Sequence, residues 1–244
     1  MHKSYSIIPR ILQTIAWLPT RLLLVGFCGF EVRGTQHLDG IDQAIFAVNH
    51  ANELDPIILT AAINPLGRFA PMFYVAGPLD GFHDKKFGWR RRLYSSSWFF
   101  RAWGAYPHVP GHKNYERSLA QHRTILKNGG SLCIFPEGGT TKDGKLREGK
   151  GGVAYLSHAT HVPVIPVAIV GTYRLSFKRF LDRRYHITLV FGKPKYVHEI
   201  IAHSAPEPAR FKDVAREIMA EIETSIESAL REARHALQRV ERSL

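Results

Sequence analysis

The segment AIFAVNHANELDP, residues 44–56, passes from an unbroken apolar run into a polar stretch that ends at a proline. The apolar run, residues 44–48, has the length and composition of a buried strand. The polar residues that follow would then lie at the carboxyl end of that strand, where open α/β sheets place their active sites. This segment predicts an α/β fold and a functional site at one edge of its sheet.

Apolar runs of similar length recur along the chain, with amphipathic stretches between them that predict helices. The further runs span residues 72–76, 105–109, 132–135, 164–170 and 187–191. Short strands that alternate with helices predict a single α/β domain with a mostly parallel or mixed central sheet, flanked by helices on both faces.

Two helices have boundaries that the sequence predicts closely. Asn114 can cap a helix that stops at Gly129 and Gly130. Residues 208–240 predict one long C-terminal helix, because apolar side chains recur along them at every third or fourth position.

Composition and charge narrow the class of protein. The chain has 244 residues, of which 45% are apolar, so it can bury a sizeable core and is neither disordered nor fibrous. Its two cysteines, Cys28 and Cys133, lie far apart and give no reason to expect a disulfide framework, a redox pair or a zinc cluster, which favours a reducing compartment. The formal net charge is 33 − 21 = +12. It predicts an anionic partner: nucleic acid, an acidic membrane surface or a phosphorylated substrate.

Residues 1–30 form an apolar segment with helical periodicity. One helix face would carry Ile7, Ile8, Ile11, Leu12, Ile15 and Leu18, and the other Lys3, Ser6, Arg10, Gln13 and Thr14. We predict an amphipathic helix that lies on a membrane, with a helix packed on its own domain as the alternative. A transmembrane span is the weaker interpretation, because residues such as Pro19 and Arg21 interrupt the roughly 20 apolar residues that a span needs.

A region rich in basic and aromatic residues is a second indication that the protein binds an anionic surface. Lys85, Lys86, Arg90, Arg91 and Arg92 are interleaved with Phe87 and Trp89 and followed by Trp98, Phe99, Phe100 and Trp103. Rings beside cations suit the headgroup layer of an anionic bilayer, and they also suit grooves for single-stranded nucleic acid. A solvated charged loop over a buried aromatic cluster is the third interpretation.

The first chemical motif is Asn49-His50-Ala51-Asn52-Glu53-Leu54-Asp55. His50 and Asp55 would lie about 140° apart on a regular helix, so we expect them to face each other across a loop instead. A carboxylate fixes the tautomer of an imidazole, and His50 could then take a proton from an attacking hydroxyl. The alternative is that Asp55 caps a helix that begins with Pro56. A metal site is not expected, because two ligands do not close one.

The second motif is Phe135-Pro136-Glu137-Gly138-Gly139-Thr140-Thr141, again directly after a predicted strand. Lys142, Lys145, Arg147 and Lys150 follow it, and Gly151 and Gly152 open a helix. Freed backbone N–H groups, a helix N-terminus and several cations predict a phosphate cradle, with a solvated turn as the alternative. A nucleotide-binding P-loop is not expected, because Leu146 occupies the position of its Ser or Thr.

Together, in this order, the two motifs resemble those of the phosphate acyltransferase family typified by bacterial 1-acyl-glycerol-3-phosphate acyltransferases. The NHxxxxD motif stands as Asn49, His50 and Asp55, and FPEG stands as Phe135 to Gly138. The resemblance covers residues 31–192, with looser matches to two further family motifs at 104–110 and 162–167.

The resemblance implies transfer of a fatty acyl group from acyl-CoA or acyl-carrier protein to a lysolipid hydroxyl, without a covalent enzyme intermediate, a metal or another cofactor. Residues 1–30 would be the membrane-associating segment and residues 31–244 the acyltransferase domain. His50 would be the general base and Asp55 its orienting partner. The substrate-binding residues would be Asn49, Glu137, Gly138, Gly139, Thr140, Lys113 and Lys150.

The resemblance also implies that the protein binds the anionic surface of a membrane, on the cytoplasmic face of that membrane. It implies no nucleic-acid partner. Pro110 and Thr140 stand where family members commonly present arginines to the acceptor phosphate. Either Lys113, Lys142 or Lys150 substitutes for them, or the acceptor carries another headgroup. The alternative function is a non-catalytic basic protein that binds anionic lipid or nucleic acid, which would have no need of the His50 and Asp55 pair.

Overall fold

The computed structural model describes residues 4–77, 97–109, 114–175, 180–181, 185–201 and 207–242. Within these residues, seven strands form one sheet in the order β1-β7-β6-β2-β5-β3-β4. In chain order they are β1 (Glu31–Arg33), β2 (Ile45–Val48), β3 (Met72–Ala76), β4 (Ala105–Pro107), β5 (Ser131–Ile134), β6 (Val164–Val170) and β7 (Thr188–Phe191). All neighbours pair in parallel except β6 and β7, which are antiparallel. The predicted α/β class with a mixed sheet is confirmed.

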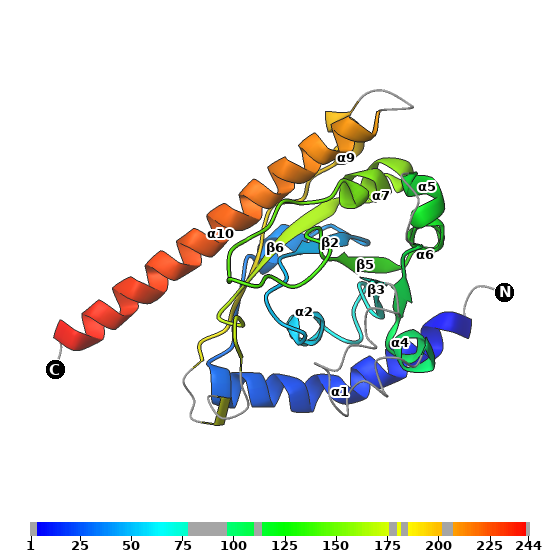
Figure 1. Cartoon of the computed structure of the whole chain (residues 1–244). Helices are drawn as coiled ribbons and strands as arrows, with labels where there is room; N and C mark the ends of the chain where they lie inside the picture. Colours follow the sequence, from blue (N-terminus) through cyan, green and yellow to red (C-terminus); the bar gives the residue numbers. More distant parts are fainter. Residues whose placement is uncertain are drawn as a thin grey trace.

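Helices cover both faces of this sheet (Figure 1). The first face carries α1 (Ser4–Cys28), α2 (Asp55–Ala62) and α4 (Ser97–Trp103). The second face carries α6 (Ala120–Lys127), α7 (Gly152–Thr160) and the long α10 (Pro208–Arg242). The short helices η1 (Thr35–Leu38), α5 (Tyr115–Ser118) and α9 (Val197–Ile200) complete the described elements.

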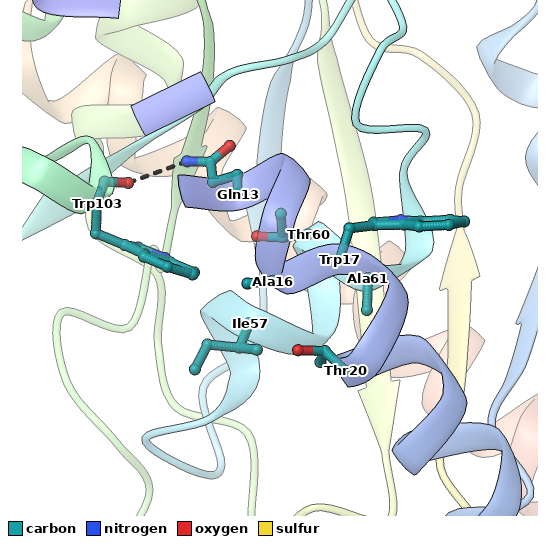
Figure 2. A pocket seen from close by; sticks show the side chains of 8 residues that line it. All are labelled: Gln13, Ala16, Trp17, Thr20, Ile57, Thr60, Ala61 and Trp103. Atoms are coloured by element: carbon teal, nitrogen blue, oxygen red, sulfur yellow. Dashed lines mark hydrogen bonds between the residues drawn. The ribbon is translucent and has the colours of Figure 1, made fainter. Parts of the chain in front are cut away.

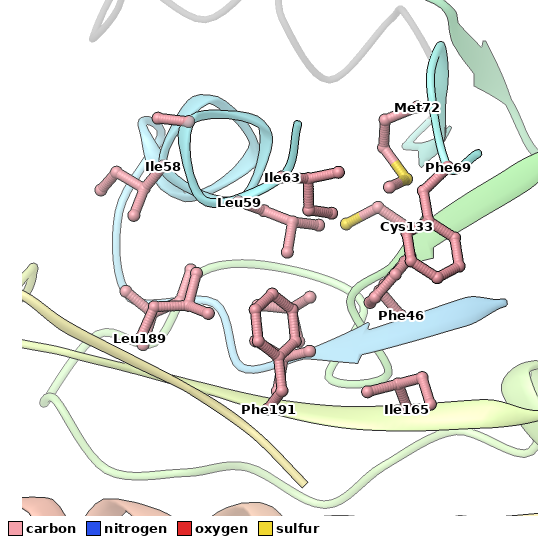
Figure 3. Packing of buried hydrophobic residues seen from close by; sticks show 14 of the residues in the cluster. Phe46, Ile58, Leu59, Ile63, Phe69, Met72, Cys133, Ile165, Leu189 and Phe191 are labelled. Carbon is pink, nitrogen blue, oxygen red and sulfur yellow. The ribbon is translucent and has the colours of Figure 1, made fainter. Parts of the chain in front are cut away.

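The central strand β2 explains why its sequence is apolar throughout. Phe46 and Val48 belong to the core on the α2 side, which Figure 3 shows with Phe46 among residues of α2 and the neighbouring strands. Ile45 and Ala47 belong to the core on the side of α7 and α10. Because successive side chains point to opposite faces and both faces are buried, β2 has no position for a polar residue.

The predicted strands all occur, with boundaries that differ by up to two residues. The prediction missed β1, whose three residues begin and end with the charged Glu31 and Arg33. The predicted cap at Asn114 is confirmed, since its Oδ1 accepts the Glu116 N–H at 2.8 Å. The helix that follows is divided, because Leu119 has a non-helical backbone between α5 and α6.

Helix α1 packs against α2, α4 and β3 through a buried polar residue. Gln13 is 2% exposed, and its Nε2 donates to the Met72 carbonyl at 2.8 Å and to the Trp103 carbonyl at 3.0 Å, the bond drawn in Figure 2. Its Oε1 accepts the Met72 N–H at 2.9 Å. Farther along α1, Arg21 donates to the Ala61 carbonyl at 2.7 Å. These contacts show that α1 is an integral part of the fold.

The outward face of α1 is apolar. Its exposed side chains include Ile7, Ile8, Ile11, Ile15, Leu18, Leu22, Leu23 and Val25. In the described part of the chain, one helical stretch, Ser6–Cys28, has the length and apolar composition that could cross a membrane. The packed-helix interpretation is therefore correct for one face, while the predicted apolar stripe faces away from the protein. The basic cluster of residues 85–92 lies outside the described residues.

Candidate active site

His50 and Asp55 meet at the carboxyl end of β2, as the sequence predicted. Asp55 is fully buried, and its Oδ2 lies 3.0 Å from His50 Nδ1. The same oxygen accepts the N–H groups of Ala51 at 2.7 Å and Asn52 at 2.8 Å. Asp55 is the first residue of α2, yet its carboxylate bonds the loop before the helix, and the helix has no side-chain cap. The capping alternative therefore does not describe this aspartate, which holds the loop and the imidazole.

The contacts of His50 determine which ring nitrogen is available. An ionised carboxylate only accepts hydrogen bonds, so Nδ1 carries the proton that Asp55 binds, and Nε2 is left as the acceptor. The imidazole also stacks on the Phe135 ring, with 4.1 Å between ring centroids and 23° between planes. The ring is therefore oriented by a hydrogen bond at one nitrogen and by an aromatic face.

Glu137 of the second motif is held by two backbone N–H groups. Glu137 is only 2% exposed. Its Oε1 accepts the His50 N–H at 2.6 Å, and its Oε2 accepts the Arg147 N–H at 2.9 Å. Burial raises the pKa of Glu137, and these two N–H groups oppose that rise. Thr141 donates its N–H to the His50 carbonyl at 2.8 Å. The turn of residues 137–141 is thus attached at both ends to the backbone of His50.

Asn49 also has a positioning contact. Its side-chain amide donates to the Ile169 carbonyl at 3.0 Å, and its Oδ1 accepts the Ile169 N–H at 2.7 Å. These bonds tie the end of β2 to β6 directly beside His50. Contact between Asn49 and a substrate stays a prediction.

The glycines of the turn make room for two cationic side chains. Gly138 has a φ of 71°, and a Cβ there would lie 2.5 Å from Lys150 Nζ. A Cβ at Gly139 would lie 3.6 Å from Arg147 Nη1. The structure therefore brings Gly138, Gly139 and Lys150 together beside His50, with Thr140 exposed on the same turn. Lys113 and Pro110 lie outside the described residues.

The start of α7 differs from the predicted phosphate cradle. The Tyr115 hydroxyl hydrogen-bonds the Gly151 backbone, and a Cβ at Gly151 would lie 3.0 Å from Phe211 of α10. Gly149 approaches Met219 of α10 in the same way, where a Cβ would lie 2.6 Å from the side chain. These glycines allow α10 to pack closely, and the helix start is covered.

Sequence reasoning left three neighbours of the site without a role. Phe135 supports the imidazole, Thr141 closes the turn, and His108 lies just beyond β4. Burial and the positive charge of Lys150 lower the pKa of His108. The signals were present, since Phe135 begins the FPEG motif and His108 lies within the loose match at 104–110.

The cysteines are not placed to act as nucleophiles. Cys28 and Cys133 are both buried. Burial, with a contribution from the charge of Asp55, raises the pKa of Cys133 well above its usual value, which disfavours the reactive thiolate. Among the described residues, no group of three or more His, Cys, Asp or Glu side chains is arranged to hold a metal ion.

Comparison with known proteins places this site in a family. A family model described as Acyltransferase matches residues 29–170, more than half of the 244 residues and both motifs. The chain belongs to the acyltransferase family. The predicted resemblance is thereby confirmed.

Individual relatives agree with this assignment. The chain is 28% identical over 195 residues to a 1-acyl-sn-glycerol-3-phosphate acyltransferase of Limnanthes alba, covering 72% of this chain and 63% of the relative. It is 27% identical over 162 residues to a probable 1-acyl-sn-glycerol-3-phosphate acyltransferase of Mycoplasma pneumoniae, covering 62% of this chain and 56% of the relative. The matches thus span about three fifths of the length of these relatives.

A solved structure supports the fold. The crystal structure of PlsC, the 1-acyl-sn-glycerophosphate (LPA) acyltransferase of Thermotoga maritima, superposes with a TM-score of 0.60. The match covers 93% of this chain and 84% of that chain at 21% identity. This acyltransferase-family chain therefore shares the fold of that structure.

Proposed function

We propose that this protein transfers a fatty acyl group from a thioester donor to the hydroxyl of a lysophospholipid. The observation that carries the proposal is the His50–Asp55 pair, joined at 3.0 Å at the carboxyl edge of the sheet. A non-catalytic lipid-binding protein would have no use for a buried carboxylate that fixes one imidazole tautomer.

The reaction needs only groups that this site offers. His50 Nε2 accepts the proton of the acceptor hydroxyl while that oxygen attacks the thioester carbonyl carbon. A C–O bond forms, the C–S bond breaks, and the thiol leaves with the proton that His50 returns. Asp55 stabilises the imidazolium between these two proton transfers. No metal or further cofactor enters this scheme, in which acyl-CoA or acyl-carrier protein is a co-substrate.

The proposed acceptor is 1-acyl-sn-glycerol 3-phosphate or a close lysophospholipid. The relatives named above carry that acceptor in their names. The net charge of +12 suits anionic substrates, and the binding residues would be those gathered at the turn of residues 137–141.

The proposed location is the cytoplasmic face of a membrane, with α1 lying in the interface. The eight exposed aliphatic side chains of α1 form a large apolar surface, which a monomeric soluble protein rarely leaves in water. The contacts of Gln13 and Arg21 hold α1 along the domain, which favours an in-plane helix over a spanning one. Residues 1–30 would thus serve both packing and membrane association.

The test is acyl transfer by the purified full chain in lipid vesicles or detergent. Long-chain acyl-CoA and acylated carrier protein are each offered with a panel of lysolipids, and products are identified by mass spectrometry. His50→Ala should lower kcat by about 10² to 10⁴, since it removes the general base. Asp55→Asn should lose less activity than His50→Ala.

A matched control is His235→Ala, which removes an exposed histidine of α10. It should retain full activity. If His50→Ala stays within threefold of the wild type, or if no lysolipid is acylated by the wild type with either donor, the proposed function is wrong.

A further inference from the structure

The first turn of α2, which carries Asp55, has no side-chain cap. The residue before the helix is Leu54, whose side chain cannot form a hydrogen bond. The Asp55 carboxylate is bound to the His50 ring and to the N–H groups of the loop before the helix. Because helix ends open more readily than helix centres, the position of Asp55 depends on what else holds this turn.

Two buried hydroxyl groups hold the turn. Tyr74 of β3 is 3% exposed, and its hydroxyl donates to the Pro56 carbonyl at 3.1 Å. Thr60 Oγ1 donates to the same carbonyl at 2.9 Å and also hydrogen-bonds the Tyr74 hydroxyl. Pro56 directly follows Asp55 in the chain. The two hydroxyls therefore attach α2 to the sheet one residue away from the carboxylate.

The Tyr74 hydroxyl keeps its proton and can act as a donor. Burial raises the pKa of Tyr74 above its usual value, and the neighbouring Cys133 acts in the same direction. A neutral phenol donates one hydrogen bond and can accept another, so it can bond a carbonyl and a threonine hydroxyl together. Breaking these bonds would leave buried polar atoms without water, which makes the attachment costly to open.

The groups involved lie on adjoining strands. His50 follows β2, β2 pairs with β5, and β5 pairs with β3. Tyr74 of β3 is in register with Cys133 of β5. The charge of Asp55 acts on the same Cys133 thiol, so Asp55 and Tyr74 approach β5 from the same face of the sheet. Strand β2 thus places the candidate base, while β3 holds the helix that carries its carboxylate.

We propose that Tyr74 is a positioning residue for acyl transfer: its hydroxyl, with that of Thr60, holds the first turn of α2 so that Asp55 stays bonded to His50 Nδ1. This inference rests on the proposed function and adds a residue that lies outside both motifs. Loss of the hydroxyl would leave the base in place and loosen the carboxylate that orients it. A small displacement of this kind slows the chemical step more than it weakens substrate binding.

The first test is steady-state kinetics on the full chain with lysophosphatidate and the thioester donor. Tyr74→Phe removes only the hydroxyl and should lower kcat about tenfold, the effect of losing one hydrogen bond in the transition state. KM for both substrates should change less than about threefold. Thr60→Val should behave like Tyr74→Phe, while Thr60→Ser, which keeps the hydroxyl, should retain the wild-type kcat.

Tyr185→Phe is the matched control. Tyr185 is 9% exposed, and its hydroxyl donates to the Arg174 carbonyl at 2.7 Å, so the change removes the same group from the segment before β7. It should leave kcat and both KM values unchanged. An unchanged kcat in Tyr74→Phe would overturn the proposal. A rise in either KM at constant kcat would also overturn it, because the hydroxyl would then serve substrate binding.

A double-mutant cycle separates positioning from general destabilisation. In Asp55→Asn the carboxylate is already lost, so loosening α2 has little further effect on the base. Tyr74→Phe should therefore lower kcat less than about twofold in the Asp55→Asn background, compared with about tenfold in the wild type. A tenfold loss in both backgrounds would overturn the proposal, because Tyr74 would then act independently of Asp55.

Amide hydrogen exchange tests the attachment without relying on activity. The Ile57 and Ile58 N–H groups bond the Leu54 carbonyl at the start of α2. Tyr74→Phe should speed their exchange at least about fivefold, while the amides of α7 keep their wild-type rates. If the wild type acylates no lysolipid, the proposed function fails, and this measurement still tests whether Tyr74 holds α2. Unchanged exchange at both amides would overturn the proposal whatever the activity.

Discussion

The two long helices α1 and α10 lie on opposite sides of the sheet and expose opposite kinds of side chain (Figure 1). Helix α10 buries Phe211, Val214, Ile218 and Ile222 and turns charged residues outward. Helix α1 buries Gln13 and turns Ile11, Ile15 and Leu18 outward, along with other aliphatic residues.

This difference shows that an apolar stripe does not by itself identify the packed face of a helix. Both helices have helical periodicity, and both are attached to the domain. In α10 the apolar stripe is removed from water by the sheet and α7. In α1, Leu24 and Cys28 are buried in the core and Gln13 hydrogen-bonds β3 and α4, while most of the apolar stripe is exposed on the opposite face. The following experiments test this contrast.

The largest effect is expected from charges on the outer face of α1. Ile11→Glu, Ile15→Glu and Leu18→Glu combined should weaken partition into anionic vesicles by about 4 kcal/mol or more, roughly 1000-fold, since each buried Ile or Leu contributes about 1.5 to 3 kcal/mol. Vesicle co-sedimentation measures this change. The matched control is Ala209→Glu, Ala220→Glu and Thr224→Glu on the exposed face of α10, with the same change in charge. Equal losses in both triple variants would show that charge alone drives binding.

The next effect concerns stability. Ile218→Ala in α10 should lower the free energy of unfolding by about 2 to 5 kcal/mol, because this side chain is 0% exposed and leaves a cavity. Ile15→Ala in α1 should change it by less than about 0.5 kcal/mol, because Ile15 is 69% exposed. Urea unfolding in the absence of lipid measures both. Similar costs at the two positions would mean that the outer face of α1 is packed in solution.

Acid should lower the free energy of unfolding through His122, a buried residue of α6 on the same side of the sheet as α10. Burial lowers the pKa of His122 from 6.5 to about 4. Below pH 6.5 the unfolded chain therefore binds a proton that the folded chain does not, so stability falls as pH drops from 6.5 towards 4. The loss should reach about 3 kcal/mol.

The measurement is the free energy of unfolding at pH 7 and pH 4.5, in wild type and His122→Gln. His122→Gln lacks the imidazole, so its free energy of unfolding should fall less between pH 7 and pH 4.5 than that of the wild type. The difference between the two proteins should be most of the about 3 kcal/mol expected from His122. An identical pH dependence in the two proteins would mean that folding does not lower the pKa of His122.

The smallest effect is expected at the attachment of α1. Gln13→Leu should cost about 1 to 3 kcal/mol, because it leaves the Met72 N–H buried without its partner. Gln121→Leu, an exposed change on α6, is the control and should be neutral. Differential scanning calorimetry compares the two. A neutral Gln13→Leu would show that the hydrogen bonds of Gln13 do not contribute to holding α1.

Much of the fold followed from local pattern. Runs such as residues 44–48 and 164–170 predicted strands, and the strands β2 and β6 that form there have both faces largely buried, which leaves no position for a polar residue. Strand β1 could not be predicted, because its three residues pair with β7, far away in the chain. The contact between His50 and Asp55 was predictable from their spacing. Five residues apart, the two side chains point apart on a regular helix and can face each other only across a loop.

Local sequence pattern was enough to predict the alternation of strands and helices, the position of the two motifs at strand ends, and the pairing of His50 with Asp55. These features depend on neighbours within a few residues, where backbone periodicity leaves few arrangements. The direction in which the apolar stripe of α1 faces, and the cations that reach the Gly138–Gly139 turn, became clear only from the folded chain. Those outcomes depend on contacts between distant segments, such as Gln13 with Met72 and Glu137 with the backbone of His50, and no local pattern encodes them.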